Sequence, residues 1–412
     1  MTAPARTDFR RGACPGLSTP MQTGDGLLAR LMPSGTITLD AMAGLATAAR
    51  RYGNGIVEIT SRGSIQVRGL TRDSALAFAE AAATLGIPAH DGVPVIAGPL
   101  AGLDPDELID AGALADELRA ALARQSFTQQ LAPKISVTID GGGRLHLDAL
   151  TADIRLRAAA APDGPRLHVA VGGDATTATP LGTIAPAAAI DTVTRLLREI
   201  ASHGPDARAH DAIRGEQLDA SRPASRRSAD PIGPHRLRGD LVAIGIGFAY
   251  GHTDATTLDA LLSVARATGA GGLRTAPGRA LLILGIAPHR TATVIDAAGR
   301  LGFVVAANDP RRRVVACAGA PICASGEIAA RALAPGIADA VAPLLEPGEV
   351  IHVSGCAKGC AHHGPSALTV IGRGGACDLL VDGARAGSCA VELLPQHLAE
   401  LARRPQPKVQ HG

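Results

Sequence analysis

Four of the seven cysteines form two close pairs in the last hundred residues of the chain. Cys317 and Cys323 enclose five residues, and Cys356 and Cys360 enclose three. Four thiolates are typical ligands of an iron–sulfur cluster, because soft anionic sulfur suits iron and offsets the cluster charge. Small residues such as Gly355 let backbone N–H groups donate to the sulfurs. The pattern predicts a 4Fe-4S cluster held by Cys317, Cys323, Cys356 and Cys360.

Two plainer interpretations of these cysteines remain open. Zinc sites use gaps of about two to four residues, which fits one pair loosely and the other not at all. Buried structural cysteines are also common, although four in two Gly/Ala/Pro-rich loops weigh against that reading. The three remaining cysteines lack such spacing and are expected to be structural or surface thiols: Cys14, Cys377 and Cys389.

A second group of candidates consists of basic and polar residues on predicted strands. Arg62, Gln66 and Arg68 alternate along one strand and can share a face. Arg274 and Arg279 stand near the corresponding place of the second half. Guanidinium groups bind carboxylates in bidentate geometry, so the set favours an anionic ligand. Solvated strand ends are the alternative for any one of them.

The elements that position these residues come from an internal repeat. At an offset of 216 residues, Gly53 and Gly55 fall on Gly269 and Gly271, and the match extends over some fifty residues. Each copy has the pattern helix, strand, strand, helix. This order predicts an α+β fold in which helices cover one face of an antiparallel sheet. A duplicated unit has a pseudo-twofold axis, where a cleft can receive loops from both halves.

The repeat and the later α+β segments divide the chain into five predicted parts. They are a first copy of the repeat, an α+β segment that follows it, a linker, a second copy and a last α+β segment with the paired cysteines, at 15–88, 125–203, 204–238, 239–304 and 311–404.

Composition excludes some function classes. The net charge is +2 and only 2% of residues are aromatic, so neither nucleic acid nor a membrane surface is indicated as a partner. Met1 to Arg11 has no apolar core of a signal peptide, and the apolar run at 241–250 is too short to span a bilayer. The expected location is the cytoplasm.

The cysteine spacing, together with Thr60–Gln66 and Leu273–Arg279, resembles the sirohaem-containing sulfite and nitrite reductase superfamily. The resemblance covers nearly the whole chain. It implies duplicated ferredoxin-like half-domains and 4Fe-4S domains in pseudo-twofold symmetry. It also implies that the tetrapyrrole is contacted by Arg62, Gln66, Arg274 and Arg279. Lys134, which resembles an anion-binding lysine, and Arg68, which shares the strand face, complete the predicted tetrapyrrole-binding set.

The chain departs from the reductases at the anion site. Lys134 matches the first of two anion-binding lysines, but Ser136 stands where the second belongs, and the loop 91–100 lacks the expected arginine. A site that reduces sulfite or nitrite needs concentrated positive charge. Segments at Cys14, at 99–105 and at 356–362 instead resemble the precorrin-3B synthase branch, in which the tetrapyrrole is the substrate.

That branch implies O2-dependent hydroxylation of precorrin-3A with lactone formation, in cobalamin biosynthesis, with electrons from an external reductase or ferredoxin. It also implies a mononuclear non-haem iron, for which His362 is a candidate ligand beside His352 and His363. Catalytic residues stay unassigned. The alternatives are a sirohaem-dependent nitrite or sulfite reductase and a non-enzymatic iron–sulfur carrier or sensor.

Overall fold

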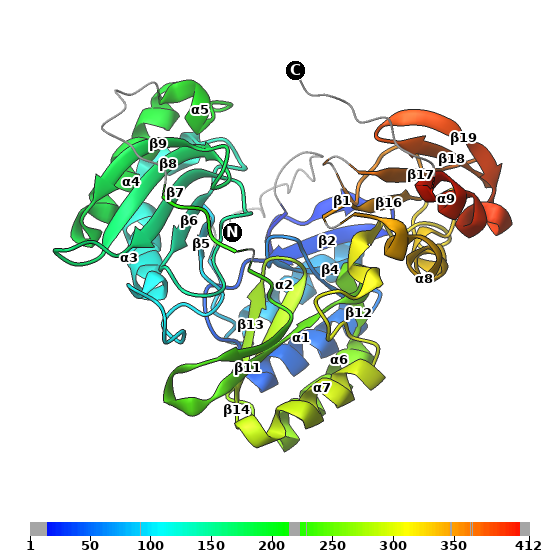
Figure 1. Cartoon of the computed structure of the whole chain (residues 1–412), viewed down its shortest axis with the longest axis horizontal. Helices are drawn as coiled ribbons and strands as arrows, with labels where there is room; N and C mark the ends of the chain where they lie inside the picture. Colours follow the sequence, from blue (N-terminus) through cyan, green and yellow to red (C-terminus); the bar gives the residue numbers. More distant parts are fainter. Residues whose placement is uncertain are drawn as a thin grey trace, which may run out of the picture.

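The computed structural model describes residues 15–90, 92–213, 223–227, 229–346, 348–362, 364 and 366–403. Two sheets form a central body, and a lobe with its own five-stranded sheet stands on either side of it (Figure 1). This is the duplicated α+β architecture that the repeat predicts. Among the described residues, no helix has the length and apolarity needed to cross a membrane.

The first central sheet has the strand order β1-β2-β4-β3-β12 and is antiparallel. Thr38 caps the first helix by accepting a hydrogen bond from the Ala41 N–H. Gly63, at φ +84°, makes the turn between β3 and β4. The elements of the first half are β1 (Met21–Thr23), β2 (Gly26–Leu31), α1 (Leu39–Tyr52), β3 (Ile56–Ile59), β4 (Ile65–Leu70) and α2 (Arg72–Ala83).

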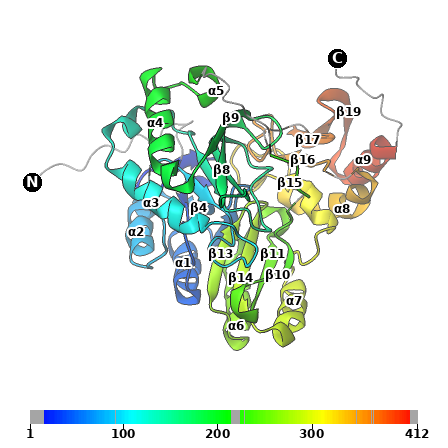
Figure 2. The ribbon, with the colours of Figure 1, turned by 60° about the vertical axis from the view of Figure 1, so that its left-hand side comes forward.

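The second central sheet has the order β10-β11-β14-β13 and is also antiparallel. Its helices, like α1, cover the face that points away from the lobes (Figure 2). The elements are β10 (Gly233–Arg236), β11 (Val242–Gly247), β12 (His252–Asp254), α6 (Ala255–Ala267), β13 (Gly272–Ala276), β14 (Ala280–Ile286) and α7 (Thr291–Arg300).

The two halves exchange short strands. β12 from the second half pairs with β3 of the first, and Ile37 of the first half pairs with Leu273 on β13. Helices α1 and α6 pack against each other, and one hydrophobic core contains Leu45 and Leu258 from these two helices. The two half-domains therefore form one packed body rather than two independent domains.

The two lobes share one topology. In each sheet the first three strands are parallel and the last three antiparallel. The first lobe has β5 (Val95–Ala97), α3 (Ala111–Ala123), β6 (Val137–Asp140), β7 (Ala152–Ala159), β8 (Arg166–Gly173), β9 (Thr179–Ile184), α4 (Ala189–Ser202) and α5 (Ala209–Ala212). The second has β15 (Val314–Ala316), α8 (Ala330–Val341), β16 (Ile351–Ser354), β17 (Leu368–Arg373), β18 (Ala376–Val381), β19 (Ala384–Ala390) and α9 (Leu394–Arg403).

The first lobe begins before the segment 125–203 that the sequence suggests. Its sheet includes β5, and α3 packs on this strand. The sequence does not indicate β5, because a three-residue strand carries too little periodicity to be recognised. The segment 204–238 contains α5 and β10 in its described parts.

Candidate active site

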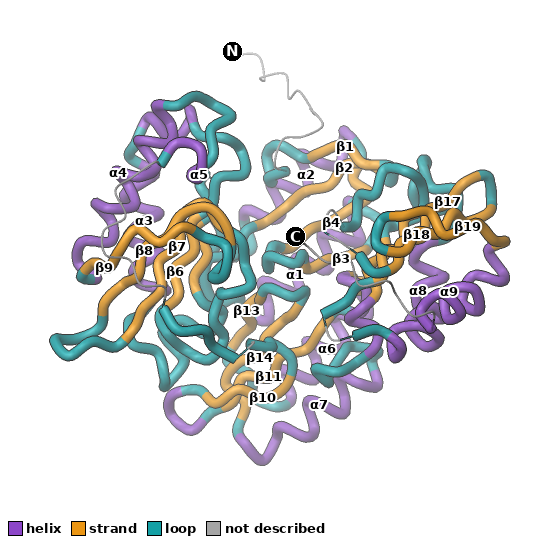
Figure 3. Tube along the Cα trace, turned by 45° about the horizontal axis from the view of Figure 1, so that its top comes forward, coloured by secondary structure: helices purple, strands orange, loops and turns teal. Residues whose placement is uncertain are grey.

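A cavity of about 1570 Å³ lies on the helix-free face of the central sheets. Figure 3 shows the two lobes on opposite sides of strands β1 to β4, and both contribute to the lining. Strand alternation explains the division of β4: Ile65 and Val67 are buried in the core, whereas Gln66 and Arg68 line the cavity. Small-molecule pockets are usually about 300–1,000 Å³, so this cavity suits a large ligand.

All four paired cysteines line this cavity. Cys317 directly follows β15, and Cys356 comes two residues after β16. These strands are parallel neighbours, so both cysteine loops leave the same edge of the sheet. The Lys358 ammonium donates to the Ser325 hydroxyl at 2.6 Å and joins the two loops. Pairs that are 39 residues apart in the sequence (317 to 356) are thereby brought together.

The surroundings of the thiols fit an iron–sulfur cluster. The Gly355 N–H donates to Cys317 Sγ at 3.0 Å, which is the backbone contact that cluster sulfurs receive. Burial raises the pKa of the Cys317 thiol, and a bound metal would favour its thiolate form. None of the six described cysteines forms a disulfide. Cys377 and Cys389 are buried opposite each other on β18 and β19, and Cys14 lies outside the described residues.

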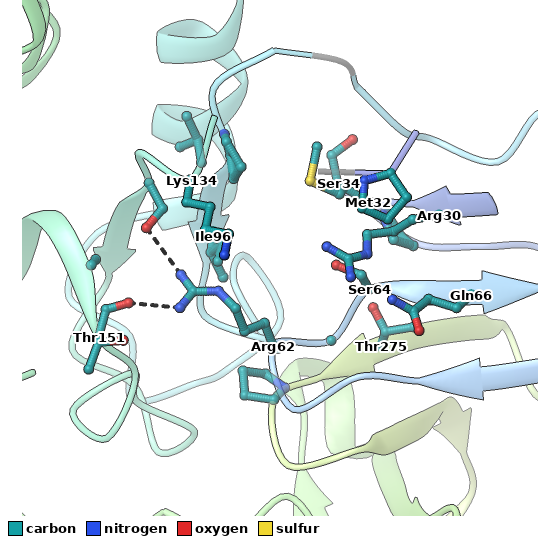
Figure 4. Close-up of a pocket in the computed structure, with 18 of the residues that line it drawn as sticks. Arg30, Met32, Ser34, Arg62, Ser64, Gln66, Ile96, Lys134, Thr151 and Thr275 are labelled. Carbon is teal, nitrogen blue, oxygen red and sulfur yellow. Dashed lines mark hydrogen bonds between the residues drawn. The ribbon is translucent and has the colours of Figure 1, made fainter. Parts of the chain in front are cut away.

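Arg62 reaches from the turn between β3 and β4 to the first lobe. Its guanidinium donates to the Ser136 hydroxyl at 3.1 Å and to the Thr151 carbonyl at 2.9 Å (Figure 4). Ser136 is the position at which the reductases are expected to have a second lysine. A lysine there would place a second cation against Arg62. Lys134 is exposed on the same stretch and lines the cavity.

Arg68 lines the cavity but is engaged by two carboxylates. Its Nε and Nη2 donate to Asp25 at 2.7 and 2.6 Å, and its Nη1 lies 3.4 Å from Glu58. Burial alone favours the neutral guanidinium, but the bonds to Asp25 and the charge of Glu58 outweigh it and raise the pKa of Arg68. These contacts suit a structural role better than a clamp for a ligand carboxylate.

Gln66 is buried and lies between a carboxylate and a guanidinium. In the amide orientation that satisfies both, its nitrogen donates to Glu58 at 3.2 Å and its oxygen accepts from Arg30 at 2.6 and 2.9 Å. Arg30 is opposite Gln66 in the register of β2 and β4, and Figure 4 shows both at the cavity wall.

The two candidate arginines of the second half differ in their position relative to the cavity. Arg274 lines the cavity, where it donates to the Thr36 hydroxyl at 3.0 Å and the Ala101 carbonyl at 2.7 Å. Arg279 is not among the lining residues. It has a left-handed backbone, at φ +63°, and its side chain lies against Gly251, where an added Cβ would be 2.8 Å from Arg279 Cδ. Burial lowers the pKa of Arg279. The expectation that both arginines reach the tetrapyrrole therefore lacks support at Arg279.

Sequence reasoning missed four further cations of the lining. They come from β2, from α3, from the start of α5 and from the second cysteine loop, and they are Arg30, Arg119, Arg208 and Lys358. Three of them reach the cavity only through tertiary packing. Lys358 alone had a local signal, because it lies between two candidate ligands.

Among the described residues, the candidate iron ligand His362 is not part of a close group of three potential metal ligands. His362 stacks edge-on with His352 at a ring distance of 5.9 Å, and neither lines the cavity. His363 lies outside the described residues. Apart from the four paired cysteines, the described part of the chain brings three potential metal ligands close together in one group, Asp140, His146 and Asp148. Arg226 pairs with both of its carboxylates, so a guanidinium already supplies the positive charge there.

The comparisons with known proteins agree with this architecture. Residues 19–85 match the nitrite/sulfite reductase ferredoxin-like half domain. A precorrin-3B synthase from Sinorhizobium sp is 40% identical over 387 residues, covering 92% of this chain and 84% of that protein. A ferredoxin–nitrite reductase from Synechococcus elongatus is 33% identical, but over only 35% of this chain and 31% of its own length.

Among solved structures, the NirA protein of Mycobacterium tuberculosis superposes with a TM-score of 0.70 at 18% identity. The match covers 93% of this chain and 82% of that protein, and at this identity it establishes the fold alone. The match to the synthase spans nearly the whole chain, whereas the match to the nitrite reductase covers about a third of it. The chain therefore belongs to the precorrin-3B synthase family, within the nitrite/sulfite reductase-like superfamily.

Proposed function

We propose that this protein is a precorrin-3B synthase, an oxidoreductase that hydroxylates precorrin-3A with O2 and forms a lactone from a ring A acetate. The observation that carries the proposal is the cavity, in which four cysteines and a set of cations face one large space. A 4Fe-4S cluster on Cys317, Cys323, Cys356 and Cys360 is part of the proposal. So is a cytoplasmic location, where thiols stay reduced.

The cations support a polycarboxylate ligand in this space. Arg30, Arg62 and Lys134 come from both the central sheet and the first lobe, so these cations line different walls of the cavity. A dispersed set suits the carboxylates around a macrocycle. A small anion such as nitrite needs its cations converged on one place.

The chemistry requires electrons from outside the chain. One oxygen atom of O2 enters the carbon framework and the other leaves as water, which consumes two electrons and two protons. When bound, the cluster supplies single-electron transfer. The residues around the cavity bind and orient the macrocycle, so that the reacting carbon is held within reach of the oxidant. No nucleotide-binding Gly-rich fingerprint follows a strand in this sequence, so the donor is a separate reductase or ferredoxin.

An absorption spectrum of protein purified without oxygen, combined with iron and sulfide assays, tests the proposal. We expect broad iron–sulfur absorption without a sirohaem band, and about four iron and four sulfide per chain. A stoichiometric sirohaem band together with nitrite or sulfite reduction would instead establish the reductase alternative. Absence of iron and sulfide from freshly prepared protein would rule out the cluster.

A further inference from the structure

A turn of the first half lies directly against one of the cysteines of the second lobe. The hairpin turn between β1 and β2 contains Gly24, and its carbonyl accepts a hydrogen bond from the Ala324 N–H at 2.8 Å. A Cβ added to Gly24 would lie only 2.1 Å from Cys323 Sγ. Gly24 does not have a positive φ, so its backbone conformation does not require glycine. The close approach of the sulfur is the feature that excludes a side chain.

The turn is fixed by a buried carboxylate next to this glycine. The side chain of Asp25 is 1% exposed and forms a bidentate pair with Arg68 on β4. The Thr23 hydroxyl also donates to Asp25, at 2.8 Å. Burial raises the pKa of Asp25, but the hydrogen bonds and charge of Arg68 outweigh it, so the net shift of this pKa is downward.

The same ion-pair network continues into the second lobe. Arg68 approaches Glu58 on β3, and Glu58 pairs with Arg331 in the first turn of α8. Helix α8 follows the loop that carries Cys317 and Cys323. Asp25, Arg68, Glu58 and Arg331 therefore tie the central sheet to this lobe, while the Gly24 carbonyl holds the cysteine loop itself.

We propose that the turn Thr23–Gly26 is a positioning element for the cluster. The close contact with Gly24 restricts the rotamer of Cys323, and the Asp25–Arg68 pair holds the turn in place. Gly24 and Cys323 both line the cavity, so this contact lies at the wall of the proposed macrocycle site. The inference rests on the proposed cluster and adds residues that do not ligate it.

Gly24→Ala tests the steric contact between Gly24 and Cys323. A free thiol can rotate away from the new methyl group, whereas a thiolate bound to iron cannot, so the variant should fold and yet assemble the cluster poorly. We expect a loss of about half or more of the iron, with unchanged far-UV circular dichroism. Gly271→Ala is the matched control, because the nearest atom to its added Cβ is the Leu284 carbonyl oxygen at 3.9 Å and its φ is ordinary.

Asp25→Asn tests the support of the turn and covers the case in which Gly24→Ala fails to fold. Removal of a charged hydrogen-bonding partner should speed iron release to a chelator about tenfold. Asp40→Asn, which removes an exposed partner of Arg266, is its control and should release iron at the wild-type rate.

The outcomes separate this inference from the proposed function. Wild-type protein without iron and sulfide refutes the cluster itself. Full wild-type iron with full iron in Gly24→Ala, or with unchanged release from Asp25→Asn, refutes the positioning role and leaves the cluster standing.

Discussion

At the scale of the residue, the contact between Ser136 and Arg62 best explains why this cavity differs from the anion site expected in the reductases. The hydroxyl of Ser136 accepts from Arg62, so one guanidinium bridges the central sheet and the first lobe. A second lysine at this position would repel it. The small residue lets the arginine define the wall of a wide cavity, which suits a macrocyclic substrate better than a small anion.

Arg62→Ala should weaken binding of the tetrapyrrole. Loss of a charged hydrogen-bonding group costs about 1.5–3 kcal/mol, so we expect KM to rise at least about tenfold. Iron content should stay at the wild-type level, because the hydrogen bonds from Arg62 to Ser136 and Thr151 lead to the first lobe, whereas the cysteine loops belong to the second. Steady-state kinetics beside Arg50→Ala, a surface arginine paired with Asp259, checks this. An unchanged KM would count against the assignment.

The cysteines allow a matched pair of variants. Cys360 is exposed, so Cys360→Ala should leave the fold intact and remove about half or more of the iron and visible absorption. Cys389→Ala, in the core of the second lobe and away from the cavity, should keep both. Equal iron in the two variants would contradict the assignment of the quartet.

At the scale of the element, the strand exchange at β12 places a histidine in an unfavourable setting. Burial, followed by the charge of Arg331, lowers the pKa of His252 to about 4. Its Nδ1 has no hydrogen-bonding partner among the described residues. The unfolded chain therefore binds a proton at this site between about pH 6.5 and 4 that the folded chain does not.

The free energy of unfolding should consequently decrease as the pH is lowered through this window. His252 contributes no penalty above about pH 6.5, and by about pH 5 it should reduce the free energy of unfolding by about 2 kcal/mol. His252→Gln should lessen the loss between about pH 8 and pH 5 by that amount. Urea unfolding at both pH values measures it, with His289→Gln at an exposed position as control. An identical pH dependence of wild type and His252→Gln would contradict the argument.

The elements also indicate what the sequence could predict. β3 and β4 are the two strands of the predicted helix, strand, strand, helix pattern in the first half, because alternation and Gly63 are local signals. The four cysteines line one cavity for a similar reason, since each pair stands on one loop after a strand. β12 and the pairing of Ile37 with Leu273 depend on contacts between the halves, which no local pattern encodes. The positions of Arg208 and Arg119 at the cavity also depend on tertiary contacts, so no local pattern predicts them.

At the scale of the whole molecule, the two halves depend on each other. α1 packs on α6, two surface pairs, Arg50–Asp259 and Arg266–Asp40, cross between these helices, and β12 completes the first sheet. The cavity likewise takes its cysteines from one half and most of its cations from the other. Duplication alone suggested a cleft, but its lining could only be known from how the lobes sit on the sheets.

Separate expression of residues 1–213 and 223–412 should test this dependence. Each fragment exposes strand edges and a helix face that the other normally covers, so each alone should aggregate. Coexpression should recover a soluble 1:1 complex, measured by size-exclusion chromatography. A monomeric first fragment with cooperative unfolding would show that the halves are independent.

The central claim is that the tetrapyrrole is the substrate and O2 the oxidant. Mass spectrometry of the product formed from precorrin-3A, under O2 enriched in the heavy isotope and with an external electron donor, tests it most directly. The account predicts one labelled oxygen atom in the product and none when turnover is attempted without O2. Recovery of unchanged precorrin-3A, or a product whose added oxygen comes from water, would contradict it.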